Sequence, residues 1–137
     1  MTQNINLDKE ELRLRLSEEQ FKVTQQGGTE TPFSGKYYKT KDMGMYHCVV
    51  CGAQLFSSDT KIDPARYERT GLVGWPSFDQ ALPGAVEFVA DNSHDMQRTE
   101  VVCSTCGAHL GHVFDDAHEA TGQHFCINSC ALELGKE

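Results

Sequence analysis

Two cysteine motifs of the same design are the most chemically informative feature of the 137-residue chain. Cys48 and Cys51 stand in the first, CVVCG, and Cys103 and Cys106 stand in the second, CSTCG. A CxxC turn brings two sulfurs within reach of one ion at about 2.3 Å, and the glycine that follows lets the backbone curl around the thiolates. Two such turns complete a tetrahedral sulfur shell, which suits zinc and leaves no open position for catalysis. The spacing therefore predicts one structural zinc ion per chain.

Other interpretations of these cysteines stay open. The motifs could be redox-active CxxC pairs, an iron site held by the same thiolates, or plain core cysteines. All six cysteines of the chain could also form three disulfides of a secreted protein. The amino terminus, however, has neither a basic start nor an apolar stretch, which favours the reducing cytoplasm, where clustered cysteines are typically metal-binding or catalytic.

Two further cysteines, Cys126 and Cys130, remain once four are assigned to the metal. Cys126 is either a candidate nucleophile or a small buried hydrophobe. Asn128 would point to the same strand face as Cys126 and could donate a hydrogen bond there. In HLGH, His109 and His112 share a strand face only if the glycine between them allows a bulge or a kink. Histidine can donate a proton to a leaving oxygen near neutral pH, although both could equally be satisfied structural groups.

The only tryptophan, Trp75, stands in GWPSF between a glycine and a proline. This sequence predicts a rigid turn, which is a poor location for a core residue and a good one for a pocket wall. Both interpretations of Trp75 stay open at this level.

The charge balance argues against nucleic acid as a partner. Lys and Arg number 12 against 20 Asp and Glu, for a formal net charge of -8. The longest basic cluster, residues 36–41, is interrupted by two tyrosines and followed by Asp42. No apolar run approaches the roughly 20 residues of a membrane helix, so we expect no membrane partner and a cytoplasmic location.

The elements that position these residues begin with two short helices within residues 8–26. Asp8 with Glu11, and Ser17 with Gln20, each form a capping-box pattern, and two glycines after residue 26 supply a stop.

Short β-prone runs separated by glycine, proline and aspartate follow from residue 29. We expect residues 63–74 to form a loop and SCALEL, residues 129–134, to close the chain with a helical turn. This pattern predicts an antiparallel, mainly β domain with strands at residues 46–50, 54–57, 86–90, 99–103, 109–114 and 124–128.

With these residues in hand, the chain resembles the B-type methionine-R-sulfoxide reductases over nearly its whole length. The resemblance rests on EEQFKVTQQGGTETPFSGKYY, the two CxxCG motifs, LFSS, GWPSF, RTEVVC, HLGHVFDD and FCINS. It implies two antiparallel sheets in a β-tent-like arrangement, short N-terminal helices, and a structural zinc opposite the active site. Residues 1–137 would form one catalytic domain, with residues 1–30 as a helical segment packing on the β core.

The resemblance also implies an activity, peptide-methionine (R)-S-oxide reductase. The enzyme would reduce methionine-R-sulfoxide in oxidised proteins through a Cys126 sulfenic acid, which thioredoxin or another thiol would recycle. His112 is the expected proton donor, with His109 and Asp116 in support, and a monomer is the expected state. The implied catalytic and substrate-binding residues are Cys126, His112, His109, Asn128, Trp75, Phe125 and His124.

Three departures from the family pattern qualify these expectations. Val73 stands where many members carry a recycling cysteine, so the usual internal disulfide is impossible; Cys130 is the candidate replacement if the chain turns after Asn128. His124 replaces an arginine two residues before the nucleophile, and could lower the thiol pKa only when protonated. The loop of residues 64–73 is longer than the family's turn. Two alternative functions remain: a zinc-ribbon binding module and an inactive redox sensor.

Overall fold

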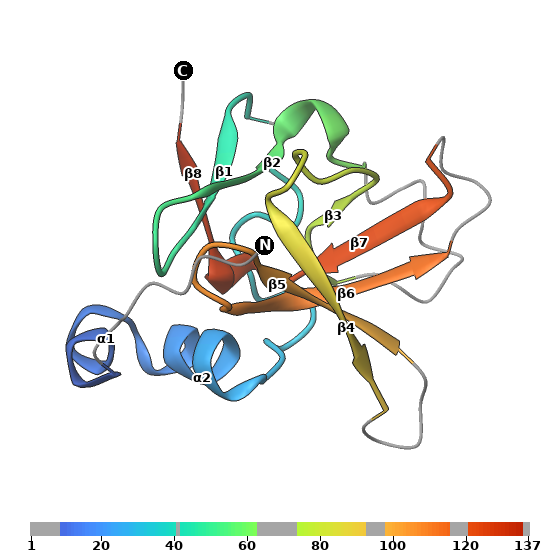
Figure 1. Cartoon of the computed structure of the whole chain (residues 1–137). Helices are drawn as coiled ribbons and strands as arrows, with labels where there is room; N and C mark the ends of the chain where they lie inside the picture. Colours follow the sequence, from blue (N-terminus) through green and yellow to red (C-terminus); the bar gives the residue numbers. More distant parts are fainter. Residues whose placement is uncertain (1–8, 41, 63–73, 93–97, 116–120, 136–137) are drawn as a thin grey trace.

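The computed structural model describes residues 9–40, 42–62, 74–92, 98–115 and 121–135 of the chain. Two short helices open this part, and strands, two 3-10 turns and the loops between them follow (Figure 1). The elements are α1 (Lys9–Arg15), α2 (Glu18–Gln26), β1 (Met45–Cys48), β2 (Gln54–Ser57), η1 (Ser58–Thr60), β3 (Ser77–Phe78), β4 (Val86–Asp91), β5 (Arg98–Cys103), β6 (His109–Asp115), β7 (Gln123–Ile127), η5 (Ser129–Ala131) and β8 (Leu132–Gly135).

The start and the end of α2 follow from its local sequence, as predicted. The Ser17 side chain accepts a hydrogen bond from the Gln20 backbone, and the Gln20 side chain accepts one from the Ser17 backbone. At the other end Gly27 adopts a left-handed conformation with φ 69°, which a glycine accepts without strain. The expected first capping box includes Asp8, which lies outside the described residues.

Two antiparallel sheets form the β part, which confirms the mainly β, two-sheet prediction. The smaller sheet has the order β2-β1-β8 and the larger one β3-β7-β6-β5-β4. Figure 1 shows the strands of the larger sheet running across those of the smaller one. The large sheet is the one that matters for the site, because β6 and β7 carry the predicted reactive residues side by side.

The six predicted strands all exist, and their ends differ from the predicted ones by at most two residues; the strand at Gln54–Ser57 matches at both ends. The largest difference is in β1, which ends at Cys48 because Val49 and Val50 belong to the first CxxC turn. The two-residue β3 was missed. The expected helical turn at residues 129–134 is correct only for η5; Leu132–Gly135 is instead a strand, because it pairs with β1. The expected loop at residues 63–74 lies, except for Gly74, outside the described residues.

Aromatic side chains fill the space between the two sheets. Phe56 on β2 stacks on Phe78 on β3 with ring centroids 4.4 Å apart, and Tyr46 on β1 meets the edge of Phe78 at 5.2 Å. Phe125 on β7 completes this cluster against Phe56. Burial of such large rings is the main stabilising contribution to a core of this size.

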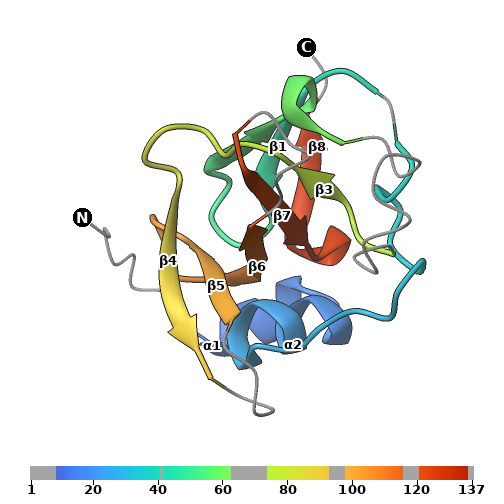
Figure 2. The same cartoon turned by 90° about the vertical axis from the view of Figure 1, so that its right-hand side faces the viewer.

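The helices cover one side of the large sheet. Helix α2 packs against β6 and η5, and Figures 1 and 2 both place α1 and α2 together beside the β5–β6 end of the sheet. Neither helix in the described ranges has the length and apolar character needed to cross a membrane.

Candidate functional site

Strand β7 presents Cys126 on the face of the large sheet opposite to the aromatic core. Successive side chains of a strand alternate between faces, so Phe125 and Ile127 point into the core while Cys126 points away from it. His112 on β6 lies directly opposite Cys126 in the strand register, which puts both side chains on the same face. Ser77 on β3 flanks Cys126 from the other side.

A β-bulge brings the two histidines of HLGH to one face, which meets the condition set by the sequence. Val101 pairs with Gly111 and Val102 pairs with His109, so Leu110 is the extra residue on β6. The rings of His109 and His112 then lie with centroids 5.5 Å apart. A glycine is required at position 111, since a Cβ atom there would collide with the Cys126 carbonyl oxygen.

Cys126 opens into a small hollow of about 80 Å³. Three of the predicted residues, Trp75, His112 and Asn128, share this hollow with Cys126, so Trp75 forms a pocket wall rather than part of the core. The size suits a small group such as the end of one side chain. The described residues that line it are Thr29, Trp75, Arg98, Gly111, His112, Phe114, Cys126 and Asn128.

Glu30, a residue that the sequence did not single out, holds two walls of the hollow. Its carbonyl oxygen accepts a hydrogen bond from the Trp75 indole N–H at 3.0 Å, and its own N–H donates to Asn128 Oδ1 at 2.9 Å. The Asn128 amide nitrogen donates in turn to the Leu110 carbonyl at 3.0 Å. These bonds fix the orientation of both Trp75 and Asn128 around Cys126.

The Cys126 thiol is held in its neutral form. Burial raises its pKa to about 12, with a smaller contribution from the negative charge of Glu30. His124, two residues before Cys126, is fully buried. The sulfur therefore lines the hollow as a thiol.

Each histidine contacts a carboxylate. His112 Nε2 lies 2.8 Å from Asp91 Oδ2, and His109 Nδ1 lies 2.6 Å from Glu100 Oε2. Burial lowers the pKa of His112, while the hydrogen bond to Asp91 opposes that shift. His109 itself is buried and does not line the hollow, so it stands behind His112.

The other predicted site residues lie outside the hollow. Phe125 is 2% exposed in the aromatic core, on the opposite face of β7. Cys130 lies half-buried in η5, where its N–H donates to Glu30 Oε1 at 2.9 Å and burial raises its thiol pKa. The chain does turn after Asn128, as a resolving role for Cys130 would require. Asp116 and Val73 lie outside the described residues.

The four cysteines of the two CxxCG motifs form a separate cluster. We call each of these turns, residues 48–52 and residues 103–107, a knuckle. The sulfur atoms of Cys48, Cys51, Cys103 and Cys106 all lie within 4.8 Å of one another. The pairs Cys48–Cys106 and Cys51–Cys103 are each 3.7 Å apart. A tetrahedron with metal–sulfur bonds of about 2.3 Å has edges of about 3.8 Å, so this spacing fits a single metal ion.

The thiol chemistry of the cluster points the same way. A hydrogen bond from Cys106 lowers the pKa of Cys103, and a hydrogen bond with Cys103 raises the pKa of Cys48. Such sharing of protons among crowded sulfurs is what a divalent cation replaces on binding.

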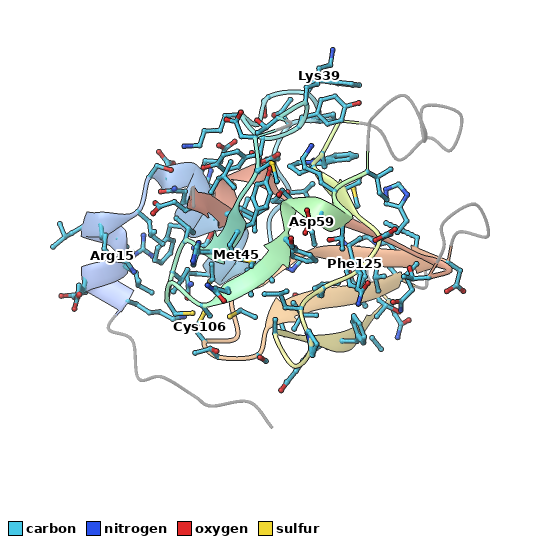
Figure 3. The ribbon with its side chains drawn as sticks, turned by 90° about the horizontal axis from the view of Figure 1, so that it is seen from above. Arg15, Lys39, Met45, Asp59, Cys106 and Phe125 are labelled. Atoms are coloured by element: carbon cyan, nitrogen blue, oxygen red, sulfur yellow. The ribbon has the colours of Figure 1, made fainter. Side chains whose placement is uncertain are left out.

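Both knuckles have the same backbone. Gly52 and Gly107 adopt φ values of 80° and 79°, and each donates its N–H to the carbonyl of the first cysteine of its motif at 2.8 Å. The predicted use of glycine at these two turns is confirmed. None of the four cysteines is among the described residues that line the hollow, so the cluster and the hollow are separate; Figure 3 shows Cys106 of the cluster apart from the core residue Phe125.

Sequence reasoning missed Glu30, Thr29, Asp91, Arg98 and Phe114 as parts of the site. Glu30 stands in TETPFSG, which reads as turn material, and its partner Asn128 is 98 positions away. No local pattern signals such a contact. An acidic residue that folding buries could have been found only from the tertiary structure.

Four clustered cysteines spaced for one metal ion and a separate thiol-lined hollow, on a two-sheet β fold, define a thiol protein with a candidate metal site. Residues 16–136 match the SelR domain family, and the chain belongs to it. It is 46% identical to the peptide methionine sulfoxide reductase MsrB of Leptospira interrogans over the full length of both chains. It is 49% identical to the MsrB of Methanosarcina mazei over 100% of this chain and 94% of that one. Identity to the mitochondrial methionine-R-sulfoxide reductase B3 of Mus musculus is 49%, over 91% of this chain and 47% of that one.

Proposed function

We propose that this protein reduces methionine-R-sulfoxide in proteins to methionine, with Cys126 as the nucleophile. The observation that carries the proposal is the hollow itself, in which the Cys126 thiol, the His112 imidazole and the Trp75 indole converge. The relatives named methionine sulfoxide reductases, one of them an R-sulfoxide reductase, support the substrate class.

The hollow can hold the sulfoxide end of a methionine side chain. The Trp75 ring offers an apolar wall for the terminal methyl group, and its orientation is fixed by the bond to the Glu30 carbonyl. His112 faces the sulfur of Cys126 across the strand pair and can reach a sulfoxide oxygen. Asn128 contributes chiefly as a fixed wall, since its amide already bonds Leu110 and Glu30.

The proposed reaction transfers the sulfoxide oxygen to the enzyme. The Cys126 sulfur attacks the sulfoxide sulfur and forms an S–S bond, while the sulfoxide oxygen gains a proton from His112 and the Cys126 thiol proton passes to His112 in return. The protonated oxygen then moves to the Cys126 sulfur as its bond to the methionine sulfur breaks, and the S–S bond breaks with its electron pair left on the methionine sulfur, which yields Cys126 sulfenic acid and methionine. Because burial keeps Cys126 protonated, this proton has to leave the sulfur during the attack.

Recycling needs two further thiol groups. One thiol attacks the sulfenic acid and releases water, and a second reduces the resulting disulfide. Val73 removes the usual internal partner. We propose direct reduction by thioredoxin or another external dithiol, with Cys130 as the alternative resolving cysteine. The raised pKa and partial burial of Cys130 favour the external route.

We propose zinc as the ion of the four-cysteine cluster, with a structural role. Four thiolates at tetrahedral spacing suit zinc and leave no position for substrate. We further propose that residues 1–137 act as one catalytic unit, which the packing of α2 on β6 and η5 supports, and that this unit is a monomer. A zinc content well below one ion per freshly purified chain would contradict the assignment.

One assay tests the activity. The protein is incubated with dithiothreitol and a peptide that carries either the R or the S epimer of methionine sulfoxide. We expect turnover of the R epimer, abolished in Cys126→Ser and retained in the matched control Cys130→Ser. Absence of turnover by the unsubstituted, metal-loaded protein would refute the proposal and favour a binding module or a redox sensor.

A further inference from the structure

Behind His112, the carboxylate of Asp91 joins the imidazole of His112 to the guanidinium of Arg98. Asp91 Oδ2 lies 2.8 Å from His112 Nε2 and 3.3 Å from the Arg98 guanidinium. The side chains of His112, Asp91 and Arg98 are 12%, 19% and 23% exposed, so water screens these interactions only in part.

The strand register builds this arrangement. Asp91 on β4 pairs directly with Arg98 on β5, and Glu100, two residues further along β5, pairs directly with His112 on β6. Residues two apart on a strand share a face, so Asp91, Arg98 and His112 all project to the side of the sheet that carries Cys126. Arg98 and His112 both line the hollow.

We propose that Asp91 and Arg98 form a positioning pair for His112, in which Asp91 holds Nε2, Arg98 holds the carboxylate, and Nδ1 is presented to a ligand in the hollow. Nδ1 has no hydrogen-bond partner among the described residues, whereas Nε2 is engaged. The neutral imidazole then carries its hydrogen on Nε2, which donates to Asp91. Proton donation into the hollow requires a second hydrogen on Nδ1, that is, the imidazolium, which the Asp91 charge stabilises.

Burial and the neighbouring charges have opposing effects on the pKa of His112. Burial makes the largest contribution and lowers its pKa; the bond to Asp91 raises it, and the positive charges of Arg98 and His109 lower it. Glu100 lies opposite His112, but its carboxylate is bonded to His109. Within the described ranges, the other titratable groups that face the hollow or flank it are Cys126 and His124 on β7 and Glu30 beside Trp75.

Loss of the Asp91 charge and loss of the Arg98 charge should therefore shift the pKa of His112 in opposite directions. Asp91→Asn removes the attraction and makes the imidazolium harder to form, whereas Arg98→Gln removes a repulsion and makes it easier to form. A residue with a merely structural role would not produce shifts of opposite sign. The catalytic consequence rests on the proposed reductase function, but the effect on the imidazole does not.

The test is a pH titration of the His112 ring by NMR, with its signals assigned by their loss in His112→Gln. We expect the titration midpoint to fall in Asp91→Asn, to rise in Arg98→Gln, and to stay unchanged in the control Asp115→Asn, a carboxylate at the exposed end of β6. Circular dichroism checks the fold, and if Asp91→Asn does not fold, the rise in Arg98→Gln still decides. If the titration midpoint of folded Asp91→Asn or Arg98→Gln does not change, or shifts in the direction opposite to the expected one, the proposal of a positioning pair is refuted.

Turnover of the R-sulfoxide peptide supplies the second measurement. In Asp91→Asn we expect kcat above neutral pH to fall about a hundredfold while KM changes less than about threefold, because the loss concerns proton donation rather than binding. The alkaline limb of the pH profile should move to lower pH in Asp91→Asn and to higher pH in Arg98→Gln. NMR shifts as expected without movement of these limbs would retain the positioning pair and refute His112 as the proton donor.

Discussion

Replacement of Arg15 by alanine should weaken metal binding at the four-cysteine cluster, for which we proposed zinc, although Arg15 is not itself a ligand. The Arg15 guanidinium donates to the carbonyls of Val49 and Val50 at 3.1 and 2.7 Å, and these two residues span the turn between Cys48 and Cys51. Helix α1 thereby holds the first knuckle in shape; in Figure 3, Arg15 lies on α1 at the same end of the molecule as Cys106. The second knuckle needs no such help, since Ser104 anchors it to the Gly84–Ala85 turn.

The size of the expected effect of Arg15→Ala on metal release follows from the two hydrogen bonds of Arg15. A bond from a charged donor contributes about 1.5–3 kcal/mol when buried and much less when exposed. The bond to Val50 is partly buried and the bond to Val49 is exposed, so their joint contribution is about 2 kcal/mol. Since 1.4 kcal/mol corresponds to a factor of ten, Arg15→Ala should release the metal about thirtyfold more readily.

The assay measures metal transfer from the protein to a colorimetric chelator in excess. Arg13→Ala is the matched control, because Arg13 lies on the same helix but packs over Phe21. We expect faster release in Arg15→Ala and release at the rate of the unsubstituted protein in Arg13→Ala. Equal rates in the two variants would show that α1 does not support the knuckle and that our reasoning is wrong.

Three further outcomes follow from the fold and the site. Gly111→Ala forces a Cβ atom against the backbone of Cys126 and to 2.9 Å from Ile127 Cα, and should lower the free energy of unfolding by about 1–3 kcal/mol in urea denaturation. Phe125→Ala should cost about 3–5 kcal/mol in the same measurement, against less than about 0.5 kcal/mol for the exposed Phe33→Ala; similar losses would contradict the placement of Phe125 in the core. In metal-loaded protein, alkylation of Cys126 by iodoacetamide should keep rising above about pH 10, because burial raises its pKa to about 12; a plateau near pH 8 would show an activated thiol instead.

The elements whose conformation depends on residues close together in the sequence could be predicted from the sequence. Ser17 and Gln20 cap α2 within one turn, and each CxxCG knuckle closes within five residues around its glycine. The alternation of side chains along β7 is equally local, so Cys126 and Phe125 had to face opposite sides of the sheet. This alternation does not indicate which of the two sides packs against the core. Phe125 was expected at the substrate and lies in the core.

The elements whose conformation depends on residues far away in the sequence could not be predicted from the sequence. The stretch LELG reads as part of a helical turn, and it is a strand because β1 offers it an edge with which to pair. Strand β3 is too short to show a pattern, and it exists because it pairs with β7 beside Cys126. In both cases a partner distant in sequence supplies the hydrogen bonds that decide the conformation.

The sequence by itself determined which groups could react: the thiol of Cys126, the imidazole of His112, and four cysteines spaced for one ion. Only the tertiary structure decided their surroundings. Glu30 reaches Trp75 and Asn128, and Asp91 reaches His112, across separations that no window of the chain reveals. Residue type fixes the chemistry that a side chain can perform, but its pKa and orientation depend on burial and on neighbouring charges, which exist only once the chain has folded.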